Sequence, residues 1–325
     1  MAVACAHSTW ASCPAYVLHI SLAISIPILR AFYYHVPYIT LPEFYLTAMA
    51  YIKPDHYAVI GNPVAHSKSP QIHALFAQQT HQQLVYTANL VVLDQFEHAL
   101  QTFAENGGKG LNITVPFKHA AWQWVTQRSP RAERAGAVNT ILFRPDSTSY
   151  GDNTDGTGLV RDLKHNQGVT IRGQRVLLLG AGGAARGVLM PLLEEQPAHL
   201  VIVNRTADKA VALAKDLTDV GTVTGCAYQD LGAESFDIII NGTSASLKGE
   251  VPALSASAIA KECLCYDMMY GATPTTFMQW AQQHGAQRTL DGLGMLVEQA
   301  AESFFLWRSV RPETASVISA IRAQL

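Results

Sequence analysis

Residues 176–187 read VLLLGAGGAARG, an apolar run that ends in a glycine-rich turn. Four apolar residues in succession predict a buried strand, and the small residues after it predict a tight turn that opens a helix. The turn fits the pattern G-x-G-x-x-A at Gly180, Gly182 and Ala185. Such a turn lets the backbone approach a pyrophosphate, whose charge the helix N-terminus stabilises. We therefore expect a dinucleotide-binding site, although a plain small-residue turn would look alike in isolation.

The segment after the next predicted strand indicates which dinucleotide binds. Residues 199–203 read HLVIV and are followed by Asn204, Arg205 and Thr206. A site for NAD usually carries a carboxylate at this point, to bind the ribose hydroxyls. An Arg guanidinium and a Thr hydroxyl instead suit a 2′-phosphate, and Lys209 adds charge one helical turn later. This pattern favours NADP over NAD, although a single solvated Arg after a strand would look the same.

The rest of the chain predicts two α/β lobes. Apolar runs at 200–203, 236–240 and 264–266 are separated by helix-length segments, as in a doubly wound parallel sheet. Residues 57–142 also alternate short strands with helical segments, which predicts a first α/β lobe with mostly parallel strands.

Two glycine-rich breaks set the predicted domain boundaries. GDNTDG at 151–156 precedes a helical stretch, and DGLG at 291–294 precedes a helix around Met295 to Trp307. That helix carries apolar residues at helical spacing, so one face packs on a core, and we expect it to return to the first lobe. The predicted division is a substrate-binding domain of residues 49–154 and 292–325, a Rossmann-like NADP-binding domain of residues 155–291, and an extension of residues 1–48.

Composition limits the classes of function. The 325 residues carry a formal net charge of −2 and no strongly basic block, which argues against nucleic acid as a partner. The five cysteines lack paired CxxC spacing, so we expect reduced thiols and no metal site. Cys263 and Cys265 alternate along an apolar run, which places both on one face of a predicted strand, where packing is their simplest role.

The first 48 residues differ from the rest, because they contain only two charged side chains, Arg30 and Glu43. The run from Tyr16 to Tyr34 is largely apolar but contains a His, a Pro and an Arg, so it makes a poor membrane span. No basic residue precedes it as in a secretory signal. We interpret the segment as an extension that the fold does not need, with Met49 as an alternative start, and leave a membrane or targeting role open.

Residues 66–70, HSKSP, predict a helix start and an anion site. Ser69 suits the N-cap and Pro70 the first helical position, and apolar residues follow at helical spacing. Hydroxyl groups of Ser67 and Ser69 at a helix N-terminus suit a carboxylate. Capping alone explains Ser69 equally well, but it leaves Ser67 without a role.

Two charged residues outside the dinucleotide motif suit proton transfer. Residues 111–115, LNITV, alternate as a strand that Pro116 ends, and Lys118 follows near the end of this strand. A partly desolvated amine at such a place can transfer protons, although an exposed lysine is the simpler alternative. Asp155 lies in a stretch that begins like a calcium loop, but the twelfth position is Leu163 rather than Glu. We interpret Asp155 as a site carboxylate, with a polar turn as the alternative.

Taken together, these and further motifs resemble the shikimate dehydrogenase family. The resemblance runs in order from about Tyr57 to the last predicted helix. The motifs are HSKSP (66–70), NITVPFK (112–118), AGAVNT (135–140), GDNTDG (151–156), GAGGA (180–184), NRT (204–206), YDMMY (266–270) and DGLGMLVEQ (291–299). One departure is Lys209, because Arg is common at this position in the family.

The resemblance implies an oxidoreductase that reversibly reduces 3-dehydroshikimate to shikimate with NADPH, a step toward chorismate and the aromatic amino acids. It implies a catalytic pair in which Asp155 positions Lys118 to protonate the oxygen being reduced. The implied substrate site is Ser67, Ser69, Thr114, Lys118, Asn139, Asp155, Tyr270 and Gln299. The implied NADP(H) site is Gly180, Ala181, Gly182, Gly183, Ala184, Asn204, Arg205, Thr206, Lys209, Met268 and Gly292.

The same interpretation sets the remaining expectations. We expect a cytoplasmic enzyme that acts on a small molecule, without a membrane or nucleic-acid partner; the oligomeric state, a homodimer included, stays open. A quinate/shikimate dehydrogenase, with broader substrate choice and often NAD, is the nearest alternative, and NRT at 204–206 counts against it. A non-catalytic relative that senses the ligand is expected to lack Lys118 or Asp155, and both are present. A membrane-anchored form would use residues 16–34.

Overall fold

The glycine-rich turn at residue 180 follows a central strand of a six-stranded parallel sheet, the C-terminal sheet. In this computed structural model, which describes residues 53–325, the strand order is β12-β11-β10-β7-β8-β9 and every neighbouring pair is parallel. The strands are β7 (Arg175–Leu179), β8 (His199–Val203), β9 (Val223–Cys226), β10 (Phe236–Asn241), β11 (Ile259–Asp267) and β12 (Arg288–Asp291). The order reverses between β7 and β10, so the predicted doubly wound sheet is confirmed.

Both faces of the C-terminal sheet are buried. Val176 and Leu178 of β7 pack into one core, and Leu177 and Leu179 pack into the other. Because both faces are covered, the strand is a continuous apolar run instead of an alternation. The first face is covered by α9 (Gly183–Glu194) and α10 (Ala207–Lys215), and the second by α11 (Thr276–Gln283).

The cysteines of β11 lie in the second of these cores. Cys263 and Cys265 are both 0% exposed, and their Sγ atoms are 3.9 Å apart. Their predicted place on one face of a strand is confirmed, and both pack among apolar side chains as free thiols.

The other six strands form a mixed sheet, the N-terminal sheet, with the order β2-β1-β3-β5-β6-β4. Its strands are β1 (Asp55–Gly61), β2 (Leu84–Leu90), β3 (Gly108–Ile113), β4 (Gln127–Arg128), β5 (Thr140–Phe143) and β6 (Ser149–Asp152). β1 runs parallel to β2 and β3, and β4 to β6, but β5 is antiparallel to both of its neighbours. The prediction of mostly parallel strands misses this hairpin, because residues 144–148 are too few for a crossover connection.

Helices also cover both faces of the N-terminal sheet. The helices of this lobe are α4 (Ser69–Gln79), α5 (Phe96–Glu105), α6 (Lys118–Trp124), α7 (Pro130–Ala135) and, at the junction with the second lobe, α8 (Asp155–Arg161). α5 and α6 contribute Leu100 and Ala121 to the core on one face. On the other face Phe76 of α4 meets Phe304 of a long helix from the C-terminal part of the chain.

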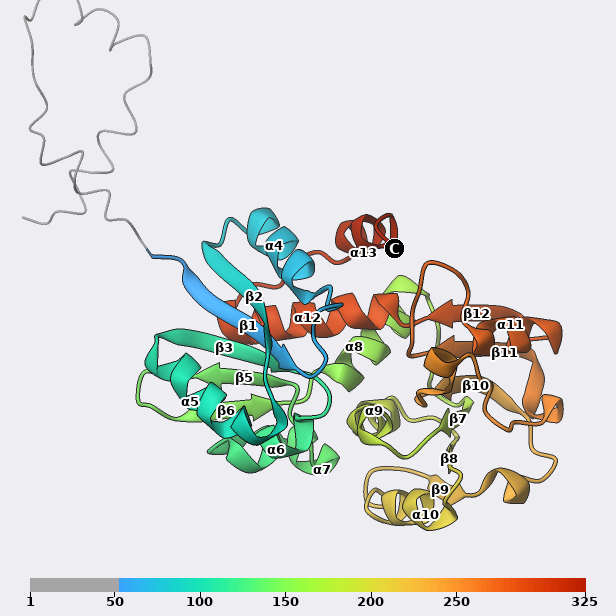
Figure 1. The fold of residues 1–325 in the computed structure, drawn as a ribbon. Helices are drawn as coiled ribbons and strands as arrows, with labels where there is room; N and C mark the ends of the chain where they lie inside the picture. The colour runs from blue at the N-terminus through green and yellow to red at the C-terminus, as the bar shows by residue number, and fades with distance from the viewer. Residues whose placement is uncertain (1–52) are drawn as a thin grey trace, which may run out of the picture. The chain divides into compact units, whose positions relative to one another are not determined.

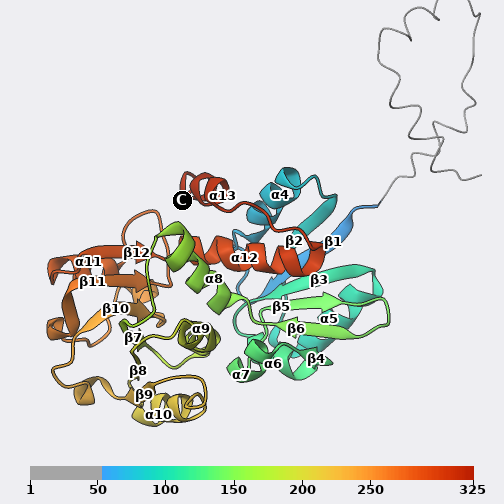
Figure 2. The same cartoon turned by 180° about the vertical axis from the view of Figure 1, so that it is seen from behind.

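That long helix, α12 (Leu293–Arg308), connects the two lobes. It begins just after β12 and runs back along the N-terminal sheet, as both views of the fold show (Figures 1 and 2). The Trp307 indole near its end donates a hydrogen bond to the Ile141 carbonyl at 2.9 Å. The predicted return of this helix to the first lobe is confirmed. A further helix, α13 (Ala315–Arg322), follows it, which the sequence pattern does not predict.

Helices α8 and α12 cross at close range where the lobes meet. A Cβ atom at Gly158 would lie 2.7 Å from the backbone nitrogen of Gln299, so a larger residue would push the helices apart. α8 starts at Asp155 and ends in a π-helical turn, Asp162–Asn166. The close crossing brings Asp155 of α8 and Gln299 of α12 near each other, and the Asn139 amide contacts both side chains.

Residues 1–52 lie outside the described part of the chain. The predictions about the extension 1–48, the apolar run 16–34 and the alternative start at Met49 therefore fall outside the described residues. Within residues 53–325, every helix is too short or too polar to cross a bilayer.

His73 of α4 is a buried aromatic side chain of the N-terminal lobe. It is 0% exposed and stacks on Tyr86, with ring centroids 4.2 Å apart. Neither ring nitrogen has a hydrogen-bond partner among the described residues. Burial, partly offset by the Asn112 side chain, lowers the pKa of His73 from 6.5 to about 3. The imidazole is therefore neutral in the folded protein at neutral pH.

We expect this histidine to make the fold sensitive to mild acid. Below pH 6.5 the unfolded chain binds a proton at His73 that the folded chain does not. The contribution of neutral, buried His73 to the free energy of unfolding is therefore complete above pH 6.5 and is lost as the pH falls toward about 3. At pH ~5 the loss is about 2 kcal/mol. Urea unfolding measured at pH ~7 and at pH ~5 should show a fall in the free energy of unfolding that is about 2 kcal/mol smaller in His73→Leu. An equal fall in both proteins would contradict this prediction.

Candidate active site

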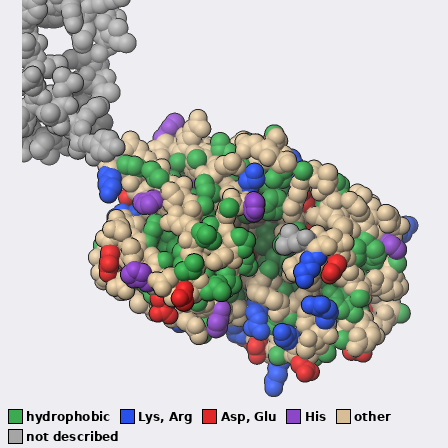
Figure 3. Space-filling view, viewed as in Figure 1, with side chains coloured by type: hydrophobic (Ala, Val, Ile, Leu, Met, Phe, Trp, Pro, Cys, Tyr) green, Lys and Arg blue, Asp and Glu red, His purple; other side chains and the backbone are tan. Residues whose placement is uncertain are grey.

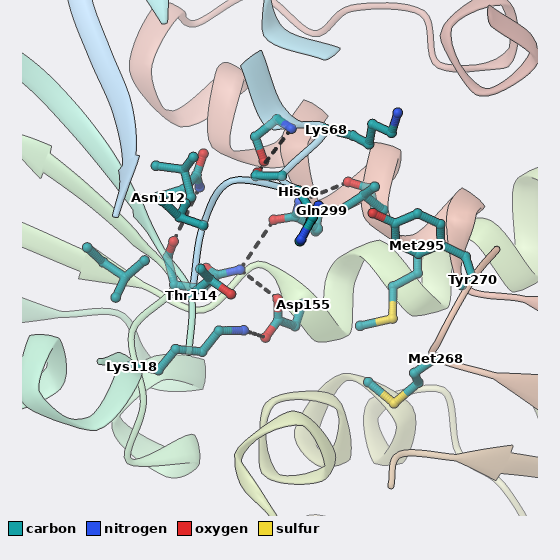
Figure 4. A pocket seen from close by; sticks show the side chains of 18 of the residues that line it. His66, Lys68, Asn112, Thr114, Lys118, Asp155, Met268, Tyr270, Met295 and Gln299 are labelled. Carbon is teal, nitrogen blue, oxygen red and sulfur yellow. Dashed lines mark hydrogen bonds and ion pairs between the residues drawn. The ribbon is translucent and has the colours of Figure 1, made fainter. Parts of the chain in front are cut away.

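A cavity of about 330 Å³ lies between the lobes, beyond the ends of β1 and β3 and beside α12. Figure 4 shows Lys118 and Asp155 pointing toward each other, with Met268, Met295 and Tyr270 across the cavity from them. The cavity brings together every residue that the resemblance assigns to the substrate: Ser67, Ser69, Thr114, Lys118, Asn139, Asp155, Tyr270 and Gln299. Met268 and Gly292, which the resemblance assigns to the nicotinamide, line the same cavity.

The Lys118 ammonium and the Asp155 carboxylate form an ion pair in the cavity wall. Lys118 is the first residue of α6 and Asp155 the first residue of α8, so the turns after β3 and β6 place them. Nζ and Oδ2 are 2.5 Å apart, and the side chains are 22% and 10% exposed. Two charges so shielded from water attract more strongly than a surface pair. The carboxylate therefore holds the ammonium at a fixed place, from which a proton can be donated into the cavity.

Asn139 fixes the other oxygen of that carboxylate. Its Nδ2 donates to Asp155 Oδ1 at 2.7 Å and to Thr154 Oγ1 at 2.9 Å, and it lies 3.4 Å from Gln299 Oε1. Its Oδ1 accepts from the Thr154 backbone N–H at 2.9 Å, which orients the amide. The network ties α8 and α12 to the start of β5, so the polar groups in this wall are held before any ligand arrives.

The N-terminus of α4 forms the opposite end of the cavity, where the sequence predicts an anion site. The prediction of Ser69 as N-cap is wrong by one residue, because α4 begins at Ser69 after Lys68 and no side chain caps it. Ser67 Oγ instead accepts the Ser69 backbone N–H at 3.3 Å, which leaves the Ser67 hydroxyl hydrogen for another acceptor. Tyr270 lines this end too, and burial raises the pKa of its hydroxyl, which stays protonated and able to donate. Several donors at a helix N-terminus suit a carboxylate.

A second cavity, of about 500 Å³, lies at the carboxyl ends of β7, β8 and β10. It is lined by the predicted turn Gly180, Ala181, Gly182, Gly183 and Ala184, and by Asn204 and Arg205. Gly180 has a φ of +105°, which L side chains rarely adopt, and a Cβ atom at Gly182 or Gly183 would enter open space. The open backbone before α9 fits a pyrophosphate at the helix N-terminus. Figure 3 shows the surface hollowed between the lobes, with Lys and Arg side chains beside the hollow.

The end of β8 carries the predicted cationic group for a 2′-phosphate. Arg205 lines the second cavity and is exposed, while Thr206 and Lys209 lie exposed at the start of α10 and outside the cavity lining. The carboxylate that NAD sites present after this strand is replaced by Asn204. Glu250, which also lines the cavity, comes from the loop after β10. The lining thus fits NADP at this strand end, with a single carboxylate elsewhere on the rim.

Three family models match the chain. A shikimate dehydrogenase substrate binding domain matches residues 59–141, a shikimate / quinate 5-dehydrogenase matches 162–258, and a shikimate 5′-dehydrogenase C-terminal domain matches 292–322. The shikimate dehydrogenase (NADP(+)) of Cellvibrio japonicus is 58% identical over 271 residues, which cover 83% of this chain and 98% of the relative. The chain belongs to the shikimate dehydrogenase family. The corresponding protein of Nitrosococcus oceani is 56% identical over 272 residues, which cover 84% of this chain and 96% of the relative.

Solved structures of shikimate dehydrogenases and related enzymes share the fold. An Ael1 enzyme from Pseudomonas putida has a TM-score of 0.78 and 48% identity, covering 82% of this chain and 97% of its own. Shikimate 5-dehydrogenase from Thermus thermophilus, solved with NADP(H) and shikimate, has a TM-score of 0.75 and 31% identity, covering 83% of this chain and 100% of its own. The predicted family, the two-lobed fold and the NADP cofactor are confirmed.

Several residues that line the shikimate dehydrogenase cavity are not singled out by the sequence. Asn112, 6% exposed, donates to Ser303 Oγ at 3.0 Å and accepts from the Tyr86 hydroxyl at 2.7 Å. A signal exists, because Asn112 alternates with the apolar residues Leu111 and Ile113 of β3, and a buried polar side chain needs partners. The strand ends at Ile113, two residues before the predicted end at residue 115, and Val115 is 60% exposed.

Other lining residues either adjoin predicted site residues or lie in segments that no motif marks. His66 and Lys68 flank Ser67, and Met295 and Leu296 of α12 follow the glycine-rich break, so they line the first cavity together with their neighbours. Tyr228, Thr243 and Lys248 line the second cavity from segments without a motif. Within residues 53–325, no group of three or more His, Cys, Asp or Glu side chains lies in an arrangement suited to a metal ion.

Proposed function

We propose that this protein catalyses the reversible NADPH-dependent reduction of 3-dehydroshikimate to shikimate, a step toward chorismate and the aromatic amino acids. The observation that carries the proposal is the shielded Lys118–Asp155 pair, whose Nζ and Oδ2 lie 2.5 Å apart in a cavity with an anion-accepting end. The family and the NADP(+) in the names of its relatives support the reaction and the cofactor.

The cavity supports one orientation of the substrate. Ser67 and Ser69 at the start of α4, with Tyr270, would hold the C1 carboxylate. A different wall presents the hydrogen-bonding side chains that would hold the ring oxygens, namely Thr114, Asn139, Asp155 and Gln299. Polar groups at both ends of a small cavity would fix a rigid ring in one pose, with its C3 carbonyl near Lys118.

NADPH supplies the hydride for the carbonyl carbon when it is bound. Lys118 donates a proton to the carbonyl oxygen, so one hydride and one proton convert the ketone into a secondary alcohol. Before that transfer, the Lys118 ammonium stabilises negative charge that develops on the oxygen. Asp155 keeps the lysine in place, and in the oxidative direction the same side chain would accept the hydroxyl proton.

The cofactor would lie along the second cavity and reach into the first. Gly180, Ala181, Gly182, Gly183 and Ala184 would bind the pyrophosphate, and Asn204, Arg205, Thr206 and Lys209 would surround the 2′-phosphate. Met268 and Gly292 would border the nicotinamide, because both line the first cavity. A Cβ atom at Gly292 would lie 2.2 Å from the Met268 carbonyl oxygen, so only glycine permits this approach of two loops.

Three further expectations complete the proposal. The substrate-binding domain comprises residues 49–154 and 292–325, and the NADP-binding domain comprises residues 155–291. A cytoplasmic location suits the free thiols of Cys226, Cys263 and Cys265. The substrate is a small molecule, and the oligomeric state, a homodimer included, stays open to measurement by light scattering of the purified protein.

Absorbance of NADPH, followed while the purified protein receives shikimate or quinate with NADP+ or NAD+, tests the function. We expect fast reduction with shikimate and NADP+ only. Equal use of quinate or NAD+ would point to a quinate/shikimate dehydrogenase with broader specificity. Binding of shikimate without turnover in any combination would overturn the proposal and leave a ligand-sensing protein.

A further inference from the structure

We propose that Arg322, near the end of the last helix, is a positioning residue for substrate binding. It would act through the segment 268–275, called here the Tyr270 loop, which joins β11 to α11 and carries Met268 and Tyr270 into the first cavity. This inference rests on the proposed function, because it assumes that Tyr270 helps to hold the substrate carboxylate.

The two ends of the Tyr270 loop are fixed by one buried carboxylate. Asp267, 0% exposed, accepts the Met269 backbone N–H at 3.0 Å and the Thr275 hydroxyl at 2.6 Å. The same carboxylate accepts the Ser246 hydroxyl at 2.6 Å. These bonds fix the first and last parts of the loop to the C-terminal sheet, but they do not reach the stretch just after Tyr270.

Arg322 binds that stretch. Its Nη1 donates to the Gly271 carbonyl at 3.2 Å, and its two terminal nitrogens lie 2.6 and 2.5 Å from the Asp291 carboxylate oxygens. Gly271 directly follows Tyr270, and Asp291 directly precedes Gly292. Residues 271–274 border a cavity of about 260 Å³ that Asp291 and Arg322 also line.

The helix that carries Arg322 is fixed to the N-terminal lobe. The Gln79 side chain at the end of α4 donates to the Glu313 carbonyl at 3.2 Å and accepts the Glu313 N–H at 2.8 Å. Val317 and Ile321 of α13 pack in the core that contains Ile72 of α4. Because α4 begins at Ser69, one rigid unit presents both the serine at the anion end and the arginine that holds the Tyr270 loop.

Arg322 therefore links the two sides of the anion end. Tyr270 belongs to the C-terminal lobe by sequence, yet it packs against the core formed by α4, α12 and α13. The Arg322 guanidinium fixes Gly271, the residue after Tyr270, to α13. This contact sets where the Tyr270 hydroxyl lies relative to Ser67 and Ser69. Since the Arg322 side chain is 45% exposed, its ion pair adds little to global stability, and its main effect is on the loop.

Steady-state kinetics of Arg322→Ala, measured on the full chain, test the inference. We expect KM for shikimate to rise about fivefold, the factor that corresponds to losing one favourable surface ion pair. We expect kcat and KM for NADP+ to change less than about twofold, because Gly292 N–H keeps its bond to the Met269 carbonyl at 3.0 Å. Arg322→Lys, which keeps the charge, should restore part of the loss.

Two controls separate positioning from a general structural effect. Arg175→Ala removes a comparable ion pair, because the Arg175 side chain is 39% exposed and its Nη2 lies 2.7 Å from Asp237 Oδ1. Arg175 begins β7, at the amino end of this strand, so the substitution should leave KM for shikimate unchanged. In a Tyr270→Phe background, Arg322→Ala should raise KM less than about twofold, because the hydroxyl it positions is already gone.

The outcomes are distinct from those that test the function. If the wild-type protein does not oxidise shikimate, the proposed function fails before Arg322 is considered. If the wild type is active but Arg322→Ala leaves KM for shikimate unchanged, or raises it equally in the Tyr270→Phe background, the positioning role is overturned. A fall in melting temperature that matches a loss of kcat and spares KM would likewise overturn it.

Discussion

Replacing Lys118 with Ala is expected to lower kcat for shikimate oxidation by about 10²- to 10⁴-fold, the range that a positioned general acid or base contributes. The physical reason is that Lys118 accepts the hydroxyl proton in the oxidative direction, and that its positive charge stabilises negative charge on the oxygen. KM for NADP+ should change little, because Lys118 does not line the second cavity. Initial rates of NADP+ reduction at saturating shikimate measure the effect.

A matched lysine provides the control. Lys109 lies on β3, the strand before Lys118, and its side chain is exposed. Lys109→Ala should keep full activity, which would exclude a general effect of removing a positive charge from this part of the lobe. A kcat within about tenfold of the wild type in Lys118→Ala would contradict the assigned role.

The second large effect is expected for Asp155→Asn, with kcat lowered by about 10²-fold or more. The substitution keeps the shape but replaces one carboxylate oxygen by an NH2 group. Asp155 Oδ2 lies 2.5 Å from Lys118 Nζ and Oδ1 lies 2.7 Å from Asn139 Nδ2, so either orientation of the new amide sets donor against donor. The lysine then loses its fixed place.

Asp146→Asn is the control for this substitution. Asp146 lies exposed in the turn between β5 and β6, where its Oδ1 accepts the Thr148 backbone N–H at 3.0 Å, a bond that Asn can also accept. Its activity should equal that of the wild type. If Asp155→Asn lost substrate affinity alone, with kcat intact, Asp155 would bind a ring hydroxyl and would not position the lysine.

Local signals predict the parts of this protein that a few adjacent residues determine. The apolar run before Gly180 predicts β7 because a strand buried on both faces needs no alternation, and the glycines predict the turn because Gly180 takes a positive φ. The helical spacing after Gly292 predicts α12 for a similar reason.

Features that depend on distant residues are not predicted in this way. Lys118 and Asp155 are 37 residues apart and meet only because β3, β5 and β6 are neighbours in one sheet, so their pairing follows from family resemblance and not from spacing. Arg322 shows the limit more clearly. Its helix is short, and its partners are Gly271 in the Tyr270 loop and Asp291 at the end of β12, so nothing adjacent in sequence marks it.

The path of α12 has a consequence for synthesis of the protein. Because the N-terminal lobe uses segments from both sides of the C-terminal sheet, the ribosome releases the whole nucleotide-binding half before the helix that closes the first half. Until Val297 and Phe304 emerge, Ile72 and Phe76 lack their packing partners and leave apolar surface on the nascent chain. The cavity between the lobes is therefore completed only when α12 packs, and a chain stalled before α12 would expose the apolar surface of α4 to chaperones.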